Sequence, residues 1–592
     1  MTKTYDAPLA HMRFALDHAA RESGLASIPA ATESLTEVAD SVLESASRFA
    51  GEVLSPLNPI GDRTPARCTP EGVVTSPGFA EAYARFRADG WTALAAPIDA
   101  GGMGLPSLIA AATGEMWAGA NLAFAMCPEV AAGAIHALTH HAPQELRERY
   151  LPALVSGEWT ASMALTEPQA GSDLSMLRTR AEPDASGDGS WRLFGRKIYI
   201  SWGDHDFTDN IVHLVLARTP DAPEGLKGIS LFLVPKRVPG PDGALHDNDI
   251  RAISLEHKMG IRASPTCAMV LGERDGARGW LVGRLHEGLA CTFTMMNEMR
   301  LGVGIHSLGL SERALQLARA HAHERHQGRT IAGPNRPIIE HADVRRMLLQ
   351  MKALTQAARG LVYTTAATLD VARLAEDESV RTAAAGRASL LTPVVKAWVS
   401  ESAFEVASLG VQIHGGTGYV DDAEISQIFR DARIGPIFEG TNYIQAQDLL
   451  NRKVIRERGT TLNALLDDIH KAAEHLPEDR AELAPLRTQT LQVCARLRDA
   501  ATGIVETAFT DADLVGSVAY HFLHWLGTLA GAWQWCLYAR SAAARPENDA
   551  TARATLDAAV FYAAHILPRA LMHEAIVRAG SAPIARVPPG SI

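Results

Sequence analysis

The chain has 592 residues, of which 47% are hydrophobic and 21% charged, a composition ordinary for a globular protein with large cores. Its net charge of −11 weighs against nucleic-acid binding as the main activity, because phosphate contacts need basic patches. The six cysteines stand far apart without a C-x-x-C pair, which predicts buried thiols in a reducing compartment. We see no secretory signal and no run of about 18 apolar residues, so we predict a cytoplasmic protein without a membrane span.

The first part of the chain is predicted to be helical. Residues 1–33 form an extension with an amphipathic piece from Met12 to Ala20. A helical domain then covers 34–157, where Ser34 and Glu37 form a candidate capping box. The pairs Ser55-Pro56 and Asn58-Pro59 are interpreted as loops.

A β-domain is predicted over 158–275, because several strand patterns follow one another without helical segments between them. This favours an antiparallel sheet or barrel. The strand patterns, rich in β-forming residues, are Trp191 to Ile200, Asn210 to Ala217, Ile229 to Pro235 and Thr266 to Leu271.

Helices return after residue 276. Apolar residues from Ile305 to Ala322 share one helical face, and further helices are predicted around 343–359 and 394–411. A helical bundle thus covers 276–455, and a further helical domain covers 461–592. The predicted fold class is α+β: a helical domain, a central antiparallel β-domain, a helical bundle and an added C-terminal helical domain.

Several familiar motifs are missing from the sequence. It contains no G-x-x-x-x-G-K-[ST], H-E-x-x-H or G-x-S-x-G pattern. Gly415, Gly416 and Gly418 follow a helix rather than a strand, so they are not a dinucleotide-binding fingerprint. The histidines fall in two groups without a carboxylate or thiol in register, so no metal site is predicted. These groups are His136 with His140, and His321 with His323 and His326.

Three stretches resemble the acyl-CoA dehydrogenase family in order and spacing. They are Met163 to Asp173 (MALTEPQAGSD), Gln412 to Tyr419 (QIHGGTGY) and Phe438 to Gln445 (FEGTNYIQ). Two shorter ones lie between them: Lys258 to Arg262, and Glu324-Arg325 with Gly328. The resemblance covers about residues 35–455. The tail after 461 is similar to a branch of the family that includes 3-methylmercaptopropionyl-CoA dehydrogenases and broad-range fatty acyl-CoA dehydrogenases.

The resemblance implies a reaction: a base removes the α-proton of an acyl-CoA thioester, and the flavin N5 of FAD accepts a hydride from the β-carbon. It places Glu439 at the base position. A carboxylate in a dry pocket is a stronger base than one in water. Taken alone, Glu439 would be a solvated surface residue. Some relatives carry their glutamate directly before the position of Arg300, where this chain has Met299, and this favours Glu439 as the sole base.

The resemblance also assigns ligand contacts. For the substrate these are Ser172, Asn297, Arg300 and Gly440; for FAD they are Leu165, Thr166, Ser172, Tyr199, Ser201, Arg325, Gln412, Gly415, Gly416 and Thr441.

Two of these assignments stay open in the sequence. Tyr199 stands where many relatives have a tryptophan that packs on the flavin, so its stacking role is not settled. Arg325 matches an arginine that reaches the cofactor diphosphate of a neighbouring subunit, which implies that the enzyme is not a functional monomer; its alternative role is a surface ion pair. In the family, C-terminal tails comparable to that after 461 cover the surface that otherwise makes tetramers, so a homodimer is expected.

Three rival functions remain beside a dehydrogenase that passes electrons to electron-transferring flavoprotein. An acyl-CoA oxidase would use the same base and reduce oxygen. A flavin monooxygenase-type relative would lack the base, and a scaffold would lack the base or the flavin motifs; Glu439 argues against both. The acyl chain length, and whether the chain carries a thioether, is not readable from the sequence.

Overall fold

The computed structural model describes residues 4–240, 242–331 and 333–591. Residues 1–3, which belong to the region where we looked for a secretory signal, lie outside this description. The chain divides into two compact units, each described here by itself. The helical unit contains Met1–Ser47, Pro106–Gly119 and Arg300–Ile592, and the β unit contains Arg48–Leu105 and Ala120–Met299. Three helices contribute residues to both units, and the domain boundaries predicted from the sequence stay a prediction.

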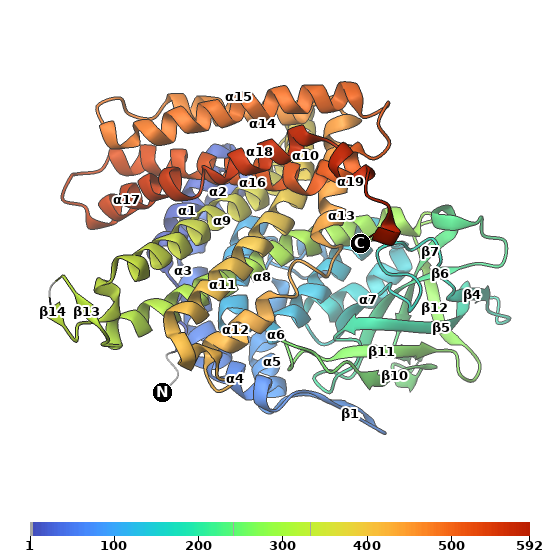
Figure 1. Cartoon of the computed structure of the whole chain (residues 1–592). Helices are drawn as coiled ribbons and strands as arrows, with labels where there is room; N and C mark the ends of the chain where they lie inside the picture. Colours follow the sequence, from blue (N-terminus) through green and yellow to red (C-terminus); the bar gives the residue numbers. More distant parts are fainter. Residues whose placement is uncertain (1–3, 241, 332, 592) are drawn as a thin grey trace. The chain divides into compact units, whose positions relative to one another are not determined.

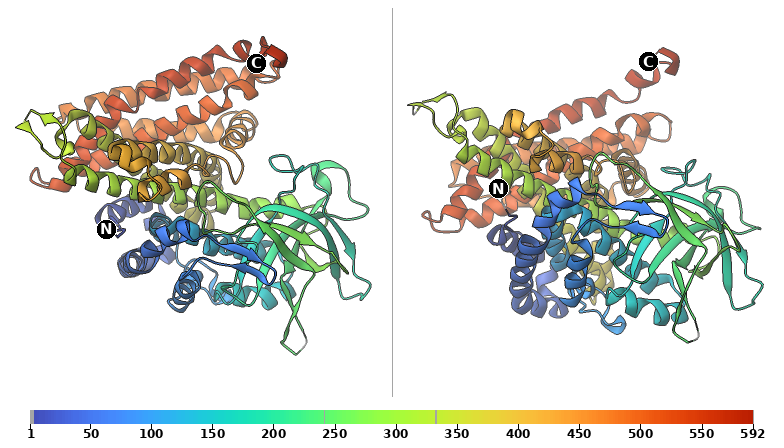
Figure 2. Two further views of the ribbon diagram at one scale, coloured as in Figure 1. Left: turned by 60° about the horizontal axis from the view of Figure 1, so that its bottom comes forward. Right: turned by 90° about the horizontal axis from the view of Figure 1, so that it is seen from below.

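The β unit is built around one twisted sheet, which Figures 1 and 2 show in cyan to green. Neighbouring strands follow the order β10-β11-β5-β12-β7-β6-β3, and β4 pairs with β5 and β6. The predicted strands are confirmed. The strands are β3 (Thr160–Ala164), β4 (Arg180–Pro183), β5 (Ser190–Ser201), β6 (Ile211–Arg218), β7 (Ile229–Pro235), β10 (Ile250–Leu255), β11 (Thr266–Leu271) and β12 (Ala277–Val282).

The sheet is antiparallel except where β3 and β4 pair with β6. Residues Thr160 to Ala164 run parallel to Ile211 to Val215. The predicted antiparallel β-domain is thus confirmed for most strand pairs, and the parallel pairs with β6 are an addition to it. The segment between β3 and β6 contains β5, which supplies the long connection that a parallel pair needs.

Strands β6 and β7 are buried on both faces. Every residue of β7 is buried and all but Ser230 are apolar, as expected for a strand covered on both sides. On one face, Leu214 and Leu231 pack into a core with Leu138 and Tyr150 from the helices α6 (Ser107–His141) and α7 (Gln144–Val155). On the other face, Val215 and Phe232 belong to a second core.

Two predictions for the first part of the β unit, one on prolines and one on a cysteine, are wrong. The pairs Ser55-Pro56 and Asn58-Pro59 do not form loops but lie in helix α4 (Ser55–Arg63), where Pro56 occupies the first turn. Helix α4 continues directly from a π-helical turn, Ala50–Leu54, and such a local change of helical hydrogen bonding is common beside prolines. Cys68 is exposed, whereas the other five cysteines are buried as predicted. Cys68 lies in the hairpin of β1 (Arg67–Thr69) and β2 (Gly72–Val74), which precedes α5 (Phe79–Ala88).

The helical unit is a bundle in which long helices follow one another with short connections (Figure 1). Residues Ser34 to Val38 form a π-helical turn without a side-chain cap, so the predicted capping box is wrong. The bundle helices are α1 (Leu9–Glu22), α2 (Pro29–Glu33), α3 (Ala39–Phe49, divided between the units), α8 (Gly288–Glu324, likewise divided), α9 (Ala342–Leu374), α10 (Glu378–Val394), α11 (Ser400–His414), α12 (Glu424–Ala432) and α13 (Asn442–Gln447). A small hairpin of β13 (Arg329–Thr330) and β14 (Gly333–Pro334) follows α8.

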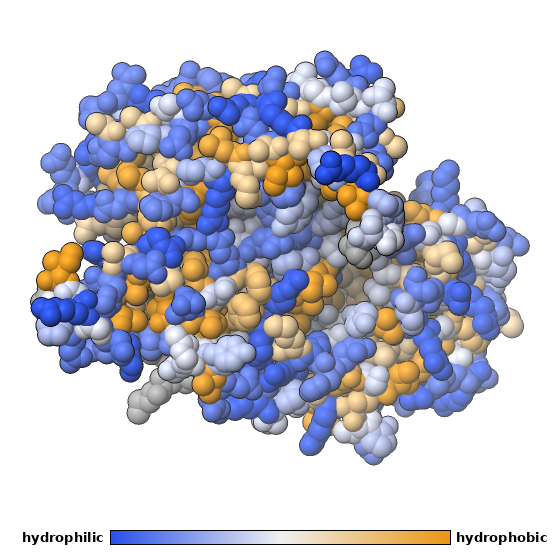
Figure 3. Space-filling model, in the orientation of Figure 1, coloured by the Kyte–Doolittle hydropathy of each residue, from blue (hydrophilic) through white to orange (hydrophobic). Residues whose placement is uncertain are grey.

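The added C-terminal part of the helical unit is helical, as predicted. Its helices are α14 (Thr460–Glu474), α15 (Ala484–Thr507), α16 (Leu514–Ala543), α17 (Ala550–His565), α18 (Arg569–Ala579) and α19 (Ala582–Ala585). Helix α16 is buried over most of its length, and its Trp525, Trp533 and Trp535 are core residues. The outer face of α14 and α15 is largely hydrophilic (Figure 3), so these helices form the outer layer of this part.

Among the described residues, α6 is the one helix whose length and composition suffice for crossing a bilayer. Its most apolar window is 72% buried within the structure, as in a core helix. Polar residues interrupt its apolar run, which explains why no long apolar stretch stands out in the sequence. The absence of a membrane span stays a prediction.

Candidate active site

The first motif of the resemblance lies in the β unit, where it begins in the last residues of strand β3 and continues into the loop after it. The Thr166 carbonyl accepts a hydrogen bond of 3.0 Å from the Ile198 N–H, and the Leu165 carbonyl accepts one of 3.1 Å from Lys197 Nζ. Both donors belong to β5, one or two residues before Tyr199. The structure thus brings Leu165 and Thr166 together with the end of β5, where Tyr199 and Ser201 lie.

A buried ion pair holds this arrangement, and the sequence analysis did not identify it. Lys197 Nζ lies 2.9 Å from Glu167 Oε1, and both side chains are almost fully buried. The Glu167 carboxylate also accepts hydrogen bonds from the N–H groups of Arg178 (2.8 Å) and Thr179 (3.0 Å). Although burial raises the pKa of Glu167, Lys197 and these hydrogen bonds lower it to about 2. Glu167 therefore ties both ends of the loop that carries Ser172.

Glu167→Gln is expected to weaken cofactor binding by about tenfold, or ~1.4 kcal/mol. A neutral amide offers fewer acceptor positions to the loop N–H groups, and it leaves the buried Lys197 ammonium without its anion. Titration of the apoprotein with FAD, followed by flavin fluorescence, measures the change. The control is Glu182→Gln, which removes an exposed partner of Arg180 in the same unit. Equal affinities for FAD in the two variants would contradict the role given to Glu167.

The end of β5 presents an aromatic ring to its surroundings. Tyr199 is 60% exposed and has a φ of 59°, which is unusual for a residue other than glycine. Trp202 also has a positive φ of 52° but is fully buried, with its ring 5.0 Å from that of Phe207. Trp202 is therefore a packing residue. An exposed, backbone-fixed tyrosine suits stacking on a planar ring system.

The proposed base lies in the helical unit, in the loop between α12 and α13. Glu439 is half-buried and has a φ of 55°, and Gly440 follows with a φ of 80°. Gln445 Nε2 donates hydrogen bonds to the carbonyls of Glu439 (3.1 Å) and Gly440 (3.3 Å). Thr441 caps α13 by accepting from the Ile444 N–H at 3.3 Å. Strained backbone that is held by its surroundings is typical of functional sites.

Two buried cations act on Glu439. Arg300 is 5% exposed and donates to Asp448 at 3.2 Å. Burial lowers the pKa of its guanidinium, whereas the negative charges of Asp448 and Glu439 raise it. Lys396 is fully buried and donates to Asn442 Oδ1 at 3.0 Å. Burial lowers the pKa of Lys396 to about 7, although the Glu439 carboxylate raises it. Lys396 was not among the residues predicted from the sequence. The one local sign of its burial is that a lysine stands within the apolar run 393–399.

The remaining candidates lie on the surface of their units. Gln412, Gly415 and Gly416 are exposed at the end of α11, and a Cβ added to either glycine would meet nothing within 4 Å. Arg325 is exposed after α8 and donates to Gln327 Oε1 at 2.8 Å. In the β unit, Ser172 and Asn297 are exposed. All of these residues are exposed within the unit to which they belong, so that unit leaves them accessible to a ligand.

The residues present fit a flavin nucleotide. The β unit offers the exposed Tyr199 ring, the half-buried hydroxyls of Thr166 and Ser201, and the exposed hydroxyl of Ser172. The helical unit offers the open backbone at Gly415 and the guanidinium of Arg325, whose fixed donors suit a diphosphate. No group of three or more potential metal ligands occurs within the described part of the chain.

The histidine groups belong to helix surfaces. The rings of His136 and His140 lie 4.4 Å apart, and His136 faces Glu298 at 3.8 Å. His321 stacks on His414 with ring centres 4.3 Å apart. Glu298, which precedes Met299, thus contacts a histidine of its own unit. No metal site is proposed at either group.

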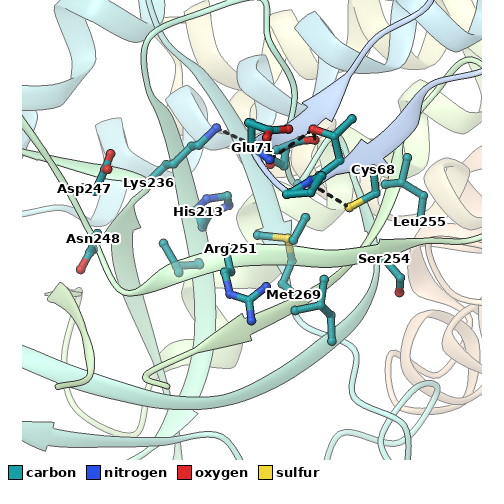
Figure 4. A pocket seen from close by; sticks show the side chains of 18 of the residues that line it. Cys68, Glu71, His213, Lys236, Asp247, Asn248, Arg251, Ser254, Leu255 and Met269 are labelled. Atoms are coloured by element: carbon teal, nitrogen blue, oxygen red, sulfur yellow. Dashed lines mark hydrogen bonds and ion pairs between the residues drawn. The ribbon is translucent and has the colours of Figure 1, made fainter. Parts of the chain in front are cut away.

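A cavity of about 730 Å³ in the β unit contains none of the predicted site residues. It lies between the β1–β2 hairpin and strand β10, and Figure 4 shows Cys68, Glu71, Lys236 and His213 around it. Lys236 is held by Asp204 at 2.5 Å. The cavity is lined by charged residues of both signs, so it favours neither anionic nor cationic ligands. The cationic residues are Arg67, Lys236, Arg237, Arg251 and Arg274, and the anionic ones are Glu71, Asp204, Asp247 and Asp249.

Four family models match successive parts of the chain. Three describe the N-terminal, middle and C-terminal domains of acyl-CoA dehydrogenases and match residues 36–158, 162–273 and 286–454. The fourth, described as acetyl-CoA dehydrogenase C-terminal like, matches residues 465–588.

Known proteins are similar over almost the same length. The chain is 42% identical to the 3-methylmercaptopropionyl-CoA dehydrogenase of Ruegeria pomeroyi, over 91% of this chain and 92% of the relative. It is 33% identical to the broad-specificity linear acyl-CoA dehydrogenase FadE5 of Mycobacterium tuberculosis, over 84% of each chain. An acyl-CoA dehydrogenase structure from Bacillus anthracis, complexed with FAD, shares the fold with a TM-score of 0.76 at 22% identity, covering 92% of this chain and 88% of that one.

Proposed function

Because the chain belongs to the acyl-CoA dehydrogenase family and is an FAD-dependent oxidoreductase of the branch with an added C-terminal domain, we propose that it converts an acyl-CoA thioester to the trans-2-enoyl-CoA with Glu439 as the base. The proposed acceptor of the electrons is electron-transferring flavoprotein. Bound FAD supplies the hydride acceptor for the β-hydrogen.

The observation that carries this proposal is the setting of Glu439. Its backbone is held in a rare conformation by Gln445, which fixes where the side chain leaves the loop. Two buried cations, Arg300 and Lys396, act on it. A half-buried carboxylate on a fixed backbone segment with cationic neighbours is a group suited to removing a weakly acidic α-proton.

The other proposed roles follow the accessible groups. Leu165, Thr166, Ser172, Tyr199 and Ser201 hold the flavin nucleotide through backbone, hydroxyl and ring contacts. Gln412, Gly415, Gly416, Thr441 and Arg325 complete its binding, with Arg325 reaching the cofactor of a partner subunit in a homodimer. Ser172, Asn297, Arg300 and Gly440 contact the substrate. The Glu439 N–H donates to the thioester oxygen, where negative charge develops.

The relative of 42% identity supports 3-methylmercaptopropionyl-CoA as the first substrate to test. The relative of 33% identity keeps straight-chain acyl-CoAs as the second class. Both classes of substrate can be tested in one experiment, because the oxidation of either class removes the same α-proton and β-hydride.

Anaerobic addition of the substrate is expected to bleach the flavin absorbance of the purified protein. The panel contains 3-methylmercaptopropionyl-CoA and straight-chain acyl-CoAs from four to sixteen carbons, and the substrate class follows from the fastest bleaching. Slow recolouring in air, with fast recolouring by electron-transferring flavoprotein, is expected of a dehydrogenase; fast recolouring in air alone would identify an oxidase. A flavin-loaded protein that none of the thioesters bleaches would refute the proposed function.

A further inference from the structure

A lysine is completely buried in the helical unit, behind the loop of the proposed base. Lys396 lies in a π-helical turn, Val395–Val399, that joins α10 to α11, and all five residues of the turn are buried. An ammonium group in such a place is costly unless other groups compensate its charge.

The direct partner of Lys396 belongs to the segment that carries Glu439. Its Nζ donates to Asn442 Oδ1 at 3.0 Å, and Asn442 lies three residues after Glu439. The Asn442 amide in turn donates to Ser400 Oγ at 3.1 Å and to Glu401 Oε1 at 3.0 Å. Asn442 is thus fixed by several partners and determines where the ammonium of Lys396 lies.

The charges that act on Lys396 within the described chain are few. After burial, the largest contribution comes from the Glu439 carboxylate, followed by the opposing charge of Arg300 and the attraction of Glu401. Helices α9, α10 and α16 also pack on the turn. Within the described residues, none of these three helices supplies a charged group that acts on Lys396. The proposed base is therefore one of the two carboxylates whose charge acts on Lys396, and the other, Glu401, shares the partner Asn442 with it.

The added C-terminal domain supplies the apolar cover of this turn. Helix α16 packs so tightly on it that a Cβ at Gly527 would lie 2.4 Å from the Trp398 ring. From the same helix, Tyr520 forms a hydrogen bond with Glu401, and burial with the charge of Glu401 raises the pKa of Tyr520 to about 12. Tyr443 donates to the Gly516 carbonyl at 3.1 Å. The helix thus contacts residues next to both members of the Lys396–Asn442 pair, and both members are buried.

We propose that Lys396 is a positioning residue that keeps the Glu439 carboxylate ionised, and that helix α16 of the added domain keeps Lys396 in a dry environment where its charge acts strongly. This inference rests on the proposed function, because it concerns the base of that reaction. The added domain thus influences catalysis, although none of its residues takes part in the reaction directly.

The sign of the effect follows from the two charges. Below about pH 7 Lys396 is protonated, and its charge favours the Glu439 anion and lowers the proton affinity of the base. Above that pH Lys396 loses its proton, and the base becomes stronger. The rate of flavin reduction by substrate in the wild-type enzyme is therefore expected to show two inflections with pH: one from Glu439 and one near pH 7 from Lys396.

The test compares the pH profile of flavin reduction, by anaerobic stopped flow, in the wild type, Lys396→Met and Lys396→Arg. Lys396→Met removes the cation, so its acid limb is expected to move about one pH unit upward. Lys396→Arg keeps a permanent charge, so its acid limb stays with the wild type but the inflection near pH 7 disappears. The matched control is Lys352→Met, which removes another lysine whose pKa is lowered by burial, with Asp557 and Arg319 as its charged neighbours.

An acid limb that does not move in Lys396→Met, or that moves equally in Lys352→Met, would overturn the proposal. If Lys396→Met fails to fold or to retain flavin, the comparison of the wild type with Lys396→Arg decides: identical profiles without an inflection near pH 7 refute it. Failure of the proposed function is distinguishable, since substrate would then not bleach the wild type, or Glu439→Gln would remain active. In that case both proposals fall together.

Discussion

Glu439→Gln is expected to slow flavin reduction by acyl-CoA at least about 10³-fold while FAD stays bound. The amide has almost the same shape as the carboxylate, so the loop held by Gln445 persists. It has no basic oxygen to take the α-proton, however. Anaerobic stopped-flow measurement of flavin bleaching gives the rate, and the spectrum before mixing gives the flavin content of the variant.

The matched control is Glu298→Gln. Glu298 is half-buried on α8, one residue from the position where some relatives carry their base, and it faces His136. This variant is expected to bleach at nearly the wild-type rate. If Glu298→Gln were inactive and Glu439→Gln active, the base would be Glu298, and the roles of Arg300 and Lys396 would need to be reassigned.

Arg359→Met is expected to destabilise the helical unit by about 3–5 kcal/mol, since it leaves a buried carboxylate without its cation. Arg359 bonds Glu115 at 2.5 Å and Glu312 at 2.8 Å, and Glu115 also accepts from Tyr363 at 2.7 Å. Glu115 is fully buried, and Arg359 is 2% exposed. The change is measured as a fall of the thermal unfolding midpoint by about 5 °C or more.

Arg346→Met provides the comparison on the same helix. Arg346 pairs with Asp343, whose side chain is 72% exposed, and exposed pairs contribute about 0–1 kcal/mol. Its unfolding midpoint is therefore expected to stay close to that of the wild type. If both variants lost the same stability, the destabilisation would reflect loss of the arginine side chain on α9 and not the unpaired carboxylate.

Local patterns determined most of the secondary structure. The strands at Ile229 to Pro235 and Thr266 to Leu271 lie at the predicted residues because β-formers fill them and turn residues flank them. The predictions failed where tertiary context outweighed a local signal. Pro56 and Pro59 stand in a helix, and β3 pairs in parallel with β6, because packing and pairing between distant segments decide these features.

The candidate site shows the same division. The motifs around Thr166, Gly415 and Glu439 were visible in the sequence, because each combines small residues and a functional group within a few positions. Their roles stay predictions. The supporting ion pair Lys197–Glu167 joins residues thirty positions apart, and the contact between Lys396 and Asn442 joins residues forty-six apart. No local pattern encodes such pairs.

By itself, the sequence determined the family, the order of helical and β segments and the flavin chemistry, because these depend on short motifs and on hydrophobic periodicity. The tertiary structure alone decided which charges are buried together. Helix packing buries the lysine between α10 and α11 and the arginine on α8, and the charge of Glu439 acts on both. Charge interactions depend on distance and solvent access, and neither quantity is written in sequence spacing.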